Sequence, residues 1–315
     1  MRLTVFTPTY NRKELLKRAY ESLKRQTSLD FMWLIVDDGS TDNTKEAVDT
    51  FIEEAPFKIE YYYFENGGKM RAHNRGVEKC STELFMCLDS DDYLSDTAVE
   101  NLIKAYDEGI KSYDALNEYK ALKEKGLNKQ NNEKYNEILK QCNCELGIAG
   151  VIAHKGISES EIFSGHSFPD IPYSTLYGLY LNGFKGETTI MFRTEVISKF
   201  PFPEIDGEKY VPEDYIYDKI DSGFQYVVVP EIITICEIVS EGYTDSVAKL
   251  KEKNKEAWYL YYEQRARITP LSLLKIKHAG FYIKFARLCN KNIFDTKLPL
   301  IYILIGLLAE KFIKK

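Results

Sequence analysis

Cysteine is scarce in this 315-residue chain, and its six cysteines show no repeated spacing. Several of them lie in apolar runs, as expected of reduced thiols in the core of a cytosolic protein. The pattern therefore argues against a disulfide framework. Cys142 and Cys144 form an isolated Cys-x-Cys pair, which by itself is weak support for a metal or redox site.

Long apolar runs are also missing. Residues 1–6 lack the apolar stretch of a signal peptide and instead predict a strand that runs into Pro8. The most apolar segment, residues 298–309, has twelve residues, fewer than the roughly 20 that a membrane-spanning helix needs. We therefore expect a cytoplasmic protein that is not exported and that does not cross a membrane through this segment.

Charge is unevenly distributed along the chain. The net charge is -6, but residues 271–315 contain nine Lys or Arg against Asp295 and Glu310, a local charge of +7 that leaves about -13 on the remainder. The acidic remainder offers no basic groove, which argues against nucleic acid as a partner. The basic end suits a phosphate-rich surface. Segment 298–309 thus has two interpretations, a helix lying on the inner face of a membrane or a helix packed on the protein's own core.

Hydrophobic residues make up 44% of the chain, enough for one large α/β core. Strand and helix patterns alternate through the first hundred residues. We predict strands at residues 3–7, 31–37, 59–64 and 84–88, and helices at residues 13–26 and 44–54. This order predicts a mixed, mostly parallel sheet flanked by helices, whose ligands bind beyond the carboxyl ends of the strands.

The second half of the chain has a less regular pattern. Residues 104–141 are rich in Lys, Glu, Asn and Gln with spaced Leu, Tyr and Ile, and they predict a solvated helix inserted between the halves of the sheet. Its charged residues are interpreted as a wet surface and nothing more. Apolar strand patterns return at residues 147–154, 188–192 and 225–229. Residues 271–315 predict a helical tail in two parts.

Three carboxylates occur within four positions at the end of an apolar strand, at Asp89, Asp91 and Asp92. Their mutual repulsion is costly without a cation. Mg²⁺ and Mn²⁺ prefer oxygen ligands and typically take one or two carboxylates together with substrate phosphates. The alternative is an acidic loop or a cap for the helix-like run that starts at Asp96. The motif favours the metal over the cap.

Polar residues also follow the first two strands. Asp37-Asp38-Gly39-Ser40 ends the second strand and opens a helix, although turn and cap chemistry alone would explain it. Pro8-Thr9-Tyr10-Asn11-Arg12 ends the first strand. An aromatic ring beside a proline at such an edge could lie against a nucleotide base or could simply pack.

Together these segments resemble the family 2 glycosyltransferases. The resemblance rests on Pro8 to Arg12, Val36 to Ser40, Asn66-Gly67-Gly68-Lys69, Asn74-Arg75-Gly76 and Leu88 to Asp92, which occur in the order and spacing of that family over residues 1–110. Beyond residue 110 it rests on Phe202-Pro203 and Val211-Pro212-Glu213-Asp214. It implies a GT-A (Rossmann-like) fold, a C-terminal helical tail, and transfer of a sugar from a nucleotide diphosphate, with uridine as the default base.

The resemblance also implies roles for individual residues. The donor nucleotide sugar would be bound by Pro8, Thr9, Tyr10, Asp38, Lys69, Asn74, Asp89 and Ser90. Asp91, with a contribution from Asp89, would hold Mn²⁺ or Mg²⁺, which offsets the charge that grows on the leaving nucleotide diphosphate. Many members carry Ala-Arg-Asn where this chain has Ala72-His73-Asn74. Lys69 and Arg71 could supply the missing positive charge.

Inverting sugar transfer needs a carboxylate that takes the proton of the acceptor hydroxyl. Glu213 and Asp214 are both candidates, and the alternative for both is an acidic first turn of a helix, which the helix dipole favours. The resemblance implies a saccharide or lipid-linked saccharide as acceptor in polysaccharide synthesis. An inactive binding partner is disfavoured because the carboxylates are intact. A sugar nucleotidyltransferase is disfavoured because a Gly-rich loop with Arg and Lys does not follow the first strand.

The resemblance further implies a division of the chain. Residues 1–235 would form the catalytic domain, with a nucleotide-sugar-binding half at 1–110, the helical insert at 104–145 and an acceptor half at 146–235. The remaining residues, 236–315, would form a helical extension that could contact a membrane.

Overall fold

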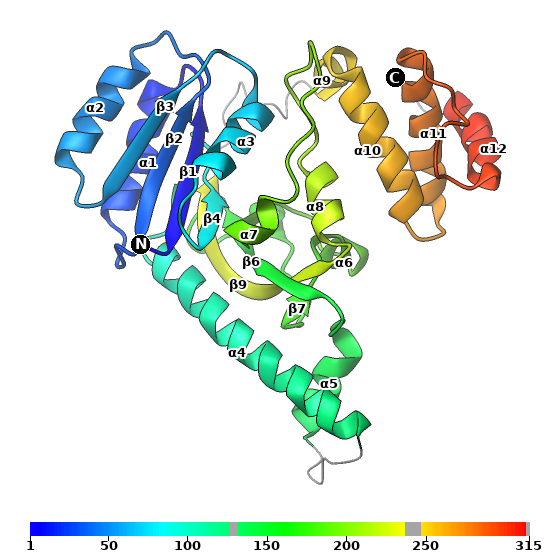
Figure 1. Ribbon diagram of the computed structural model, residues 1–315, viewed down its shortest axis with the longest axis horizontal. Helices are drawn as coiled ribbons and strands as arrows, with labels where there is room; N and C mark the ends of the chain where they lie inside the picture. Colours follow the sequence, from blue (N-terminus) through cyan, green and yellow to red (C-terminus); the bar gives the residue numbers. More distant parts are fainter. Residues whose placement is uncertain (126–131, 237–246, 313–315) are drawn as a thin grey trace. The chain divides into compact units, whose positions relative to one another are not determined.

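The computed structural model describes residues 1–125, 132–236 and 247–312 (Figure 1). The chain divides into two compact units. The first comprises residues 1–67, 72–201 and 217–238, and the second comprises 68–71, 202–216 and 239–315. Each unit is described by itself below, and the domain boundary expected near residue 235 stays a prediction.

The first unit is built on one mixed sheet (Figure 1). Along it the strands run in the order β3-β2-β1-β4-β8-β6-β9-β5, and β7 pairs with β9. Its strands are β1 (Leu3–Thr9), β2 (Phe31–Asp37), β3 (Lys58–Tyr63), β4 (Leu84–Cys87), β5 (Asp92–Leu94), β6 (Gly147–Gly156), β7 (Tyr173–Ser174), β8 (Thr188–Arg193) and β9 (Phe224–Cys236). Pairing is parallel from β3 through β4 and between β6 and β9, whereas β8 runs antiparallel between β4 and β6.

The predicted fold class is confirmed, because the sheet is mixed, mostly parallel and flanked by helices. The first unit's helices are α1 (Lys13–Lys24), α2 (Thr44–Glu54), most of α3 (Lys69–Lys79), α4 (Ala98–Glu124), α5 (Glu133–Gln141), α6 (Leu176–Leu181), α7 (Thr194–Ile197) and the end of α8 (Asp214–Ile220). Strand β5 was not predicted, since three residues carry no periodic signal. It pairs antiparallel with β9 directly after the acidic motif.

The sheet's core explains why the first strands were easy to predict. Every residue of β1 and β2 is buried, and residues 31–36 of β2 form a continuous apolar run, as expected of a strand covered on both faces. On one face, the ring of Tyr20 from α1 stacks on Phe51 from α2 with centroids 4.2 Å apart. Beneath them, Trp33 donates its indole N–H to Thr7 Oγ1 at 2.9 Å. Helices α1 and α2 are thereby fixed on the parallel strands.

Helix α3 approaches the same sheet closely because of one glycine. A Cβ on Gly76 would lie 2.4 Å from a ring carbon of Phe6 in β1. Such a contact is far shorter than real carbon contacts, so glycine is needed where α3 crosses the strand. The Asn-Arg-Gly part of the family resemblance therefore has a packing reason.

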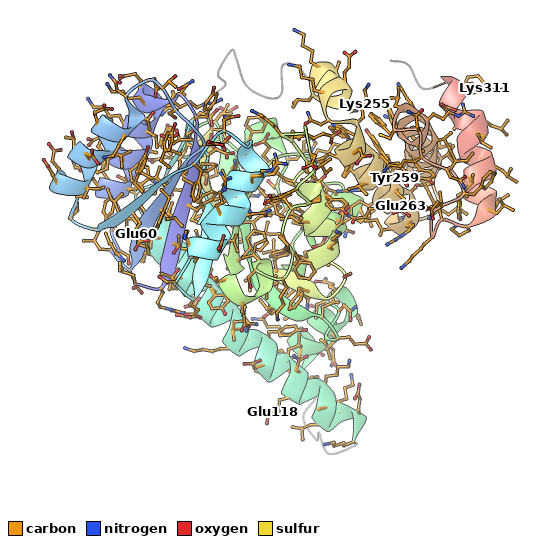
Figure 2. All side chains as sticks on the ribbon, turned by 45° about the horizontal axis from the view of Figure 1, so that its top comes forward. Glu60, Glu118, Lys255, Tyr259, Glu263 and Lys311 are labelled. Atoms are coloured by element: carbon orange, nitrogen blue, oxygen red, sulfur yellow. The ribbon has the colours of Figure 1, made fainter. Side chains whose placement is uncertain are left out.

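The predicted wet surface at residues 104–141 is wrong for one face of α4. Its Tyr106, Tyr113 and Leu116 are buried in the core of the sheet. Glu118 lies on the exposed face of the helix and is labelled in Figure 2. The abundance of Lys and Glu hides an apolar stripe with helical spacing, so composition alone gave the wrong expectation.

The second unit is helical where it is described. It contains α9 (Val247–Lys253), α10 (Lys255–Ile268), α11 (Leu273–Leu288), α12 (Leu300–Ala309) and the start of α8. Figure 2 labels Tyr259 and Glu263 along α10. The ring of Tyr259 lies 5.8 Å from that of Tyr282 on α11. The predicted helical tail in two parts is confirmed by α11 and α12, and residues 313–315 lie outside the described residues.

Candidate functional site

The carboxyl ends of β2, β1 and β4 lie side by side at one edge of the sheet. Thr9 is in register with Asp37, and Phe6 is in register with Cys87. Beyond the paired residues, Asp38 N donates to Thr9 O and Leu88 N donates to Phe6 O, both at 2.8 Å. The structure therefore brings together the three polar segments that the sequence marked as a nucleotide site.

Backbone contacts tie the loop after β1 to the loop after β2. Asn11 N donates to Ser40 Oγ at 2.8 Å, and Thr41 N donates to Asn11 Oδ1 at 2.7 Å. Asn11 has a φ of 52°, which asparagine tolerates better than most residues. Tyr10 beside it is 49% exposed, whereas Pro8 and Thr9 are buried at the end of β1. The ring of Tyr10 is thus accessible at this edge, as a base-stacking side chain must be.

Asp38 is buried and held in one orientation. Its Oδ1 accepts from Gly67 N at 2.8 Å and lies 3.9 Å from Arg75 Nη1. Its backbone oxygen accepts from Asn66 Nδ2, also at 2.8 Å. The Asn66-Gly67 segment that belongs to the family resemblance therefore fixes this carboxylate. Asn74 is half-buried on α3.

The acidic motif after β4 is neutralised in part by cations from other segments. Arg12 forms an ion pair with the Asp91 carboxylate. Lys155 Nζ, from β6, lies 2.9 Å from Asp92 Oδ2 and 3.8 Å from Asp89 Oδ2. Ser90 between these carboxylates is buried. The motif is therefore an ion cluster that joins β1, β4, β5 and β6.

Lys155 is the centre of this cluster. Only 13% of its side chain is exposed, and Glu187 Oε2 lies 3.8 Å from its ammonium. Burial opposes the charge on Lys155, but Asp92 and Asp89 outweigh it and hold its pKa well above the ordinary value. Burial also raises the pKa of Asp92 to about 6, against the opposing charge of Lys155. Both shifts follow from placing opposite charges together away from water.

The donor set fits a hard divalent cation. Asp89, Asp91, Asp92 and Glu187 are four carboxylates, and two cationic side chains, Arg12 and Lys155, contact them. A negative excess remains. Within the described parts of the chain, no three His, Cys, Asp or Glu side chains form a ready metal-binding group. Mg²⁺ uses one or two carboxylates plus phosphates, so the motif suits a cation completed by a substrate.

Of the two alternatives for the acidic motif, the helix cap is wrong. Helix α4 begins at Ala98, and Thr97 is in its N-cap position. Asp91 and Asp92 precede that position by several residues, and Asp92 begins β5.

Glu213 and Asp214 have different surroundings in the second unit. Glu213 Oε1 lies 2.8 Å from Lys69 Nζ, and 43% of the Glu213 side chain is exposed. Asp214 is the first residue of α8, and its Oδ2 accepts from Arg265 Nη2 at 2.8 Å. Crowding by protein atoms raises the pKa of Asp214, while Arg265 opposes the shift. Even so, 37% of the Asp214 side chain is exposed.

His73 and His154 have structural surroundings. His73 is buried with its ring edge-on to Phe6, at 5.7 Å between centroids, and to Phe85. His154 is stacked on Phe168 with centroids 3.7 Å apart, and burial lowers its pKa to about 4. The departure at Ala72-His73-Asn74 is therefore accompanied by packing of the imidazole against two phenylalanines.

Sequence reasoning did not single out four residues of these two clusters: Arg12, Lys155, Glu187 and Arg265. One signal was available for Lys155, because it directly follows the buried run that ends at His154. A lysine at the end of an apolar strand needs a counter-charge, and the strand-end carboxylates supply it.

The family model described as Glycosyl transferase family 2 matches residues 4–163, about half of the chain. The chain belongs to glycosyl transferase family 2. The ion cluster and the Asp38 site lie within or beside the matched residues, except that Glu187 follows them. The Glu213-Asp214 pair lies beyond the match.

Curated relatives of this family 2 chain share its first part. A teichoic acid poly(glycerol phosphate) polymerase of Staphylococcus epidermidis is 37% identical over 99 residues, covering 31% of this chain and 14% of the relative. A GalNAc(5)-diNAcBac-PP-undecaprenol beta-1,3-glucosyltransferase of Campylobacter jejuni is 33% identical over 110 residues, covering 34% of this chain and 35% of the relative. The alignments thus span about a third or less of each of these relatives.

Solved structures share the fold over almost the whole chain. The S. aureus TarS fragment in complex with UDP-GlcNAc matches with a TM-score of 0.58 at 16% identity, covering 98% of this chain and 79% of that one. The mannosyltransferase PcManGT of Pyrobaculum calidifontis, in complex with GDP-Man and Mn²⁺, matches with a TM-score of 0.52 at 16% identity, covering 99% and 81%. At these identities the likeness establishes the fold.

Proposed function

We propose that this family 2 chain is an inverting glycosyltransferase that moves a sugar from a nucleotide diphosphate donor, with uridine as the expected base, to a saccharide hydroxyl. The observation that carries the proposal is the shared edge of β2, β1 and β4, where a fixed Asp38, an exposed Tyr10 and the acidic motif lie together. Ligands of open α/β sheets bind at such an edge. The relatives' printed names, a glucosyltransferase among them, support the same class of reaction.

In this proposal the strand ends bind the donor. Tyr10 stacks on the base, and Pro8, Thr9 and Asp38 surround the base and ribose. Asn74, Asp89 and Ser90 bind further along the donor, together with Lys69. Asp91, with Asp89, holds Mn²⁺ or Mg²⁺, and when bound this ion offsets the charge that develops on the departing diphosphate. The Mn²⁺ in the PcManGT complex supports such an ion.

Asp214 is the stronger candidate for the base. A general base works best with a pKa near the operating pH, and the surroundings of Asp214 raise its pKa while leaving part of the carboxylate accessible. Glu213 Oε1 lies 2.8 Å from the Lys69 ammonium, so this carboxylate is directed at that side chain. We therefore assign proton abstraction to Asp214 and the orientation of Lys69 to Glu213.

Two measurements test this function. First, nucleotide sugars are screened with and without Mn²⁺ for protection against thermal unfolding, because a ligand of the folded state raises its stability. Second, transfer by Asp214→Asn and Glu213→Gln is compared while donor binding is monitored. We expect Asp214→Asn to abolish transfer and keep donor binding. Protection by no nucleotide sugar, or normal transfer by Asp214→Asn, contradicts the proposal.

We further propose that the acceptor is lipid-linked and that the chain meets it at the cytoplasmic face of a membrane. In the described part of the chain, no helix is both long enough and apolar enough to cross a bilayer. Helix α12 presents Leu300, Ile301, Leu304 and Leu308 on an exposed face, each at least 49% exposed. Its opposite face packs on α11, where a Cβ on Gly306 would lie 2.7 Å from Ala279 O. One face of α12 thus packs on α11, and the exposed face supports the proposal that the helix also lies on a membrane.

The positive charge around α12 favours anionic lipid as the partner of its exposed face. Residues 271–315 carry a charge of +7, and each nearby Lys or Arg adds about 1 kcal/mol of attraction to an anionic surface. The exposed basic residues include Lys277, Lys297 and Lys311, the last labelled in Figure 2. Apolar contact from α12 and this attraction together suit peripheral binding.

Liposome flotation tests the contact. We expect the protein to float with anionic vesicles at low salt and to lose this when Leu304 and Leu308 are both changed to Glu. Leu122→Glu, at an exposed leucine of α4, serves as the matched control and should still float. A wild-type protein that stays unbound on anionic vesicles, or a dimer that the Leu304 and Leu308 changes dissociate, contradicts membrane docking.

A further inference from the structure

The candidate base Asp214 is held by a helix outside the part of the chain that the family model matches. Arg265, on α10, donates from Nη2 to Asp214 Oδ2 at 2.8 Å. Only 7% of the Arg265 side chain is exposed. A guanidinium in such a position has few alternative orientations, so it fixes the carboxylate that it contacts.

Two further residues of α10 contact the start of α8. Gln264 Nε2 donates to Tyr215 O at 2.9 Å. Tyr261 hydrogen-bonds to the Asp214 side chain, and Arg265 lies over the Tyr261 ring, 5.4 Å from its centroid. Positions 261, 264 and 265 share one helix face, because residues three and four apart are neighbours on a helix. One face of α10 thus contacts the first turn of α8 at two places, the side chain of Asp214 and the backbone oxygen of Tyr215.

We propose that Arg265 is a positioning residue for the base Asp214, and that α10 is therefore part of the transfer machinery. This inference rests on the proposed function, since it assumes that Asp214 takes the acceptor proton. Arg265 binds Oδ2 and thereby sets the orientation in which the carboxylate meets the acceptor hydroxyl. Proton transfer depends on such geometry before it depends on acidity.

Arg265 also keeps Asp214 ionised. The charged and titratable groups that act on this carboxylate are Arg265 and Tyr261 of α10 and the adjacent Glu213. Crowding and Glu213 raise the pKa of Asp214, whereas Arg265 and Tyr261 lower it. Without Arg265 the pKa rises further. A base must be deprotonated, so the rate then falls at a higher pH than in the wild type.

The test compares Arg265→Met, Arg265→Lys and Tyr261→Phe in steady-state transfer across pH. For Arg265→Met we expect kcat near neutral pH to fall roughly 10- to 100-fold, less than the roughly 10²–10⁴-fold that a general base itself contributes. The donor KM should stay within about twofold, because the change affects the proton-transfer step and not donor binding. The acid limb of the pH profile should move to higher pH, so that part of the activity returns in alkaline buffer. Arg265→Lys keeps a cation and should move the limb less.

Arg267→Met is the matched control, because Arg267 lies on the same helix and pairs with Glu263. It should behave as wild type. If Arg265→Met does not fold, Arg265→Lys and Tyr261→Phe still report the acid limb. An unmoved acid limb in all three variants, or a loss seen only in donor KM, overturns the inference. Asp214→Asn separates the two failures: if it transfers normally, the base assignment fails, and if it is inactive while Arg265→Met is normal, only the positioning role fails.

Discussion

Replacing Lys155 by Met should destabilise the first unit strongly. Lys155 and Asp92 have side chains that are 13% and 7% exposed, and their charged atoms lie 2.9 Å apart. Removing one partner of a buried pair leaves an uncompensated charge and typically costs about 3–5 kcal/mol. Asp92 responds by binding a proton. Asp89 loses its own contact with the Lys155 ammonium, which lies 3.8 Å from Asp89 Oδ2. We therefore expect a loss of about 3 kcal/mol in the free energy of unfolding, at the low end of that range because protonation relieves part of the cost.

Urea unfolding of wild type, Lys155→Met, Asp92→Asn and the double variant measures this loss. The double variant should be more stable than the sum of the single losses predicts, by roughly 1–3 kcal/mol, because contacting residues are coupled. A loss below about 1 kcal/mol for Lys155→Met, or additivity within about 0.5 kcal/mol, refutes the reasoning. Lys185→Met, at an exposed lysine of the same unit, controls for loss of a surface charge.

The same variant reports on the metal. Lys155 repels a cation at Asp89, so its removal should increase the stabilisation by Mn²⁺ above that of wild type. A ligand at 100 times its Kd stabilises the folded state by about 2.7 kcal/mol, which is large enough to measure by thermal unfolding. Equal Mn²⁺ effects in both proteins argue against a cation beside Lys155.

Three further predictions follow from single contacts. Gly76→Ala should lower the free energy of unfolding by about 1–3 kcal/mol, because its Cβ would lie 2.4 Å from Phe6; urea unfolding measures it. Asp91→Asn should abolish Mn²⁺-dependent protection by donor and Mn²⁺-dependent transfer, and unchanged turnover would contradict the metal assignment. Burial lowers the pKa of His154 to about 4, so the unfolded state binds a proton that the folded state does not, and stability falls as pH drops from about 6.5 to 4. In acid titrations, His154→Gln should lose about 1–3 kcal/mol less over that range.

The sequence predicted the parallel half of the fold well, for a physical reason. Strand β2 was predicted at its observed bounds because residues 31–36 are all apolar and Asp37 leads into an Asp-Gly turn. The nucleotide edge was predicted from the same logic, since parallel strands present their carboxyl ends together. The buried side of α4 was missed, because its Tyr and Leu are diluted by Lys and Glu in a long helix.

The partners of the acidic residues could not be predicted from sequence. Lys155 reaches Asp92 across 63 residues, and Arg265 reaches Asp214 across 51. The first contact depends on the register of β5 and β6 with β9, which hydrophobic periodicity does not determine. The second depends on how α10 packs beside α8. Arginine and lysine are frequent, so the sequence does not show which of them pairs with a given carboxylate. Only the fold shows which one lies beside it.

Under the proposed function, those cations give the carboxylates of Asp91 and Asp214 different roles. Arg12, the partner of Asp91, is on a loop with 26% of its side chain exposed, and such partly exposed pairs contribute little to stability. Arg12 can therefore leave Asp91 when a divalent ion binds this carboxylate together with a diphosphate. Arg265, the partner of Asp214, is buried on a helix, and its removal from the carboxylate would leave a guanidinium without solvent. Asp91 thus suits a ligand that comes and goes with the donor, whereas Asp214 suits a base that must stay in one orientation through every turnover.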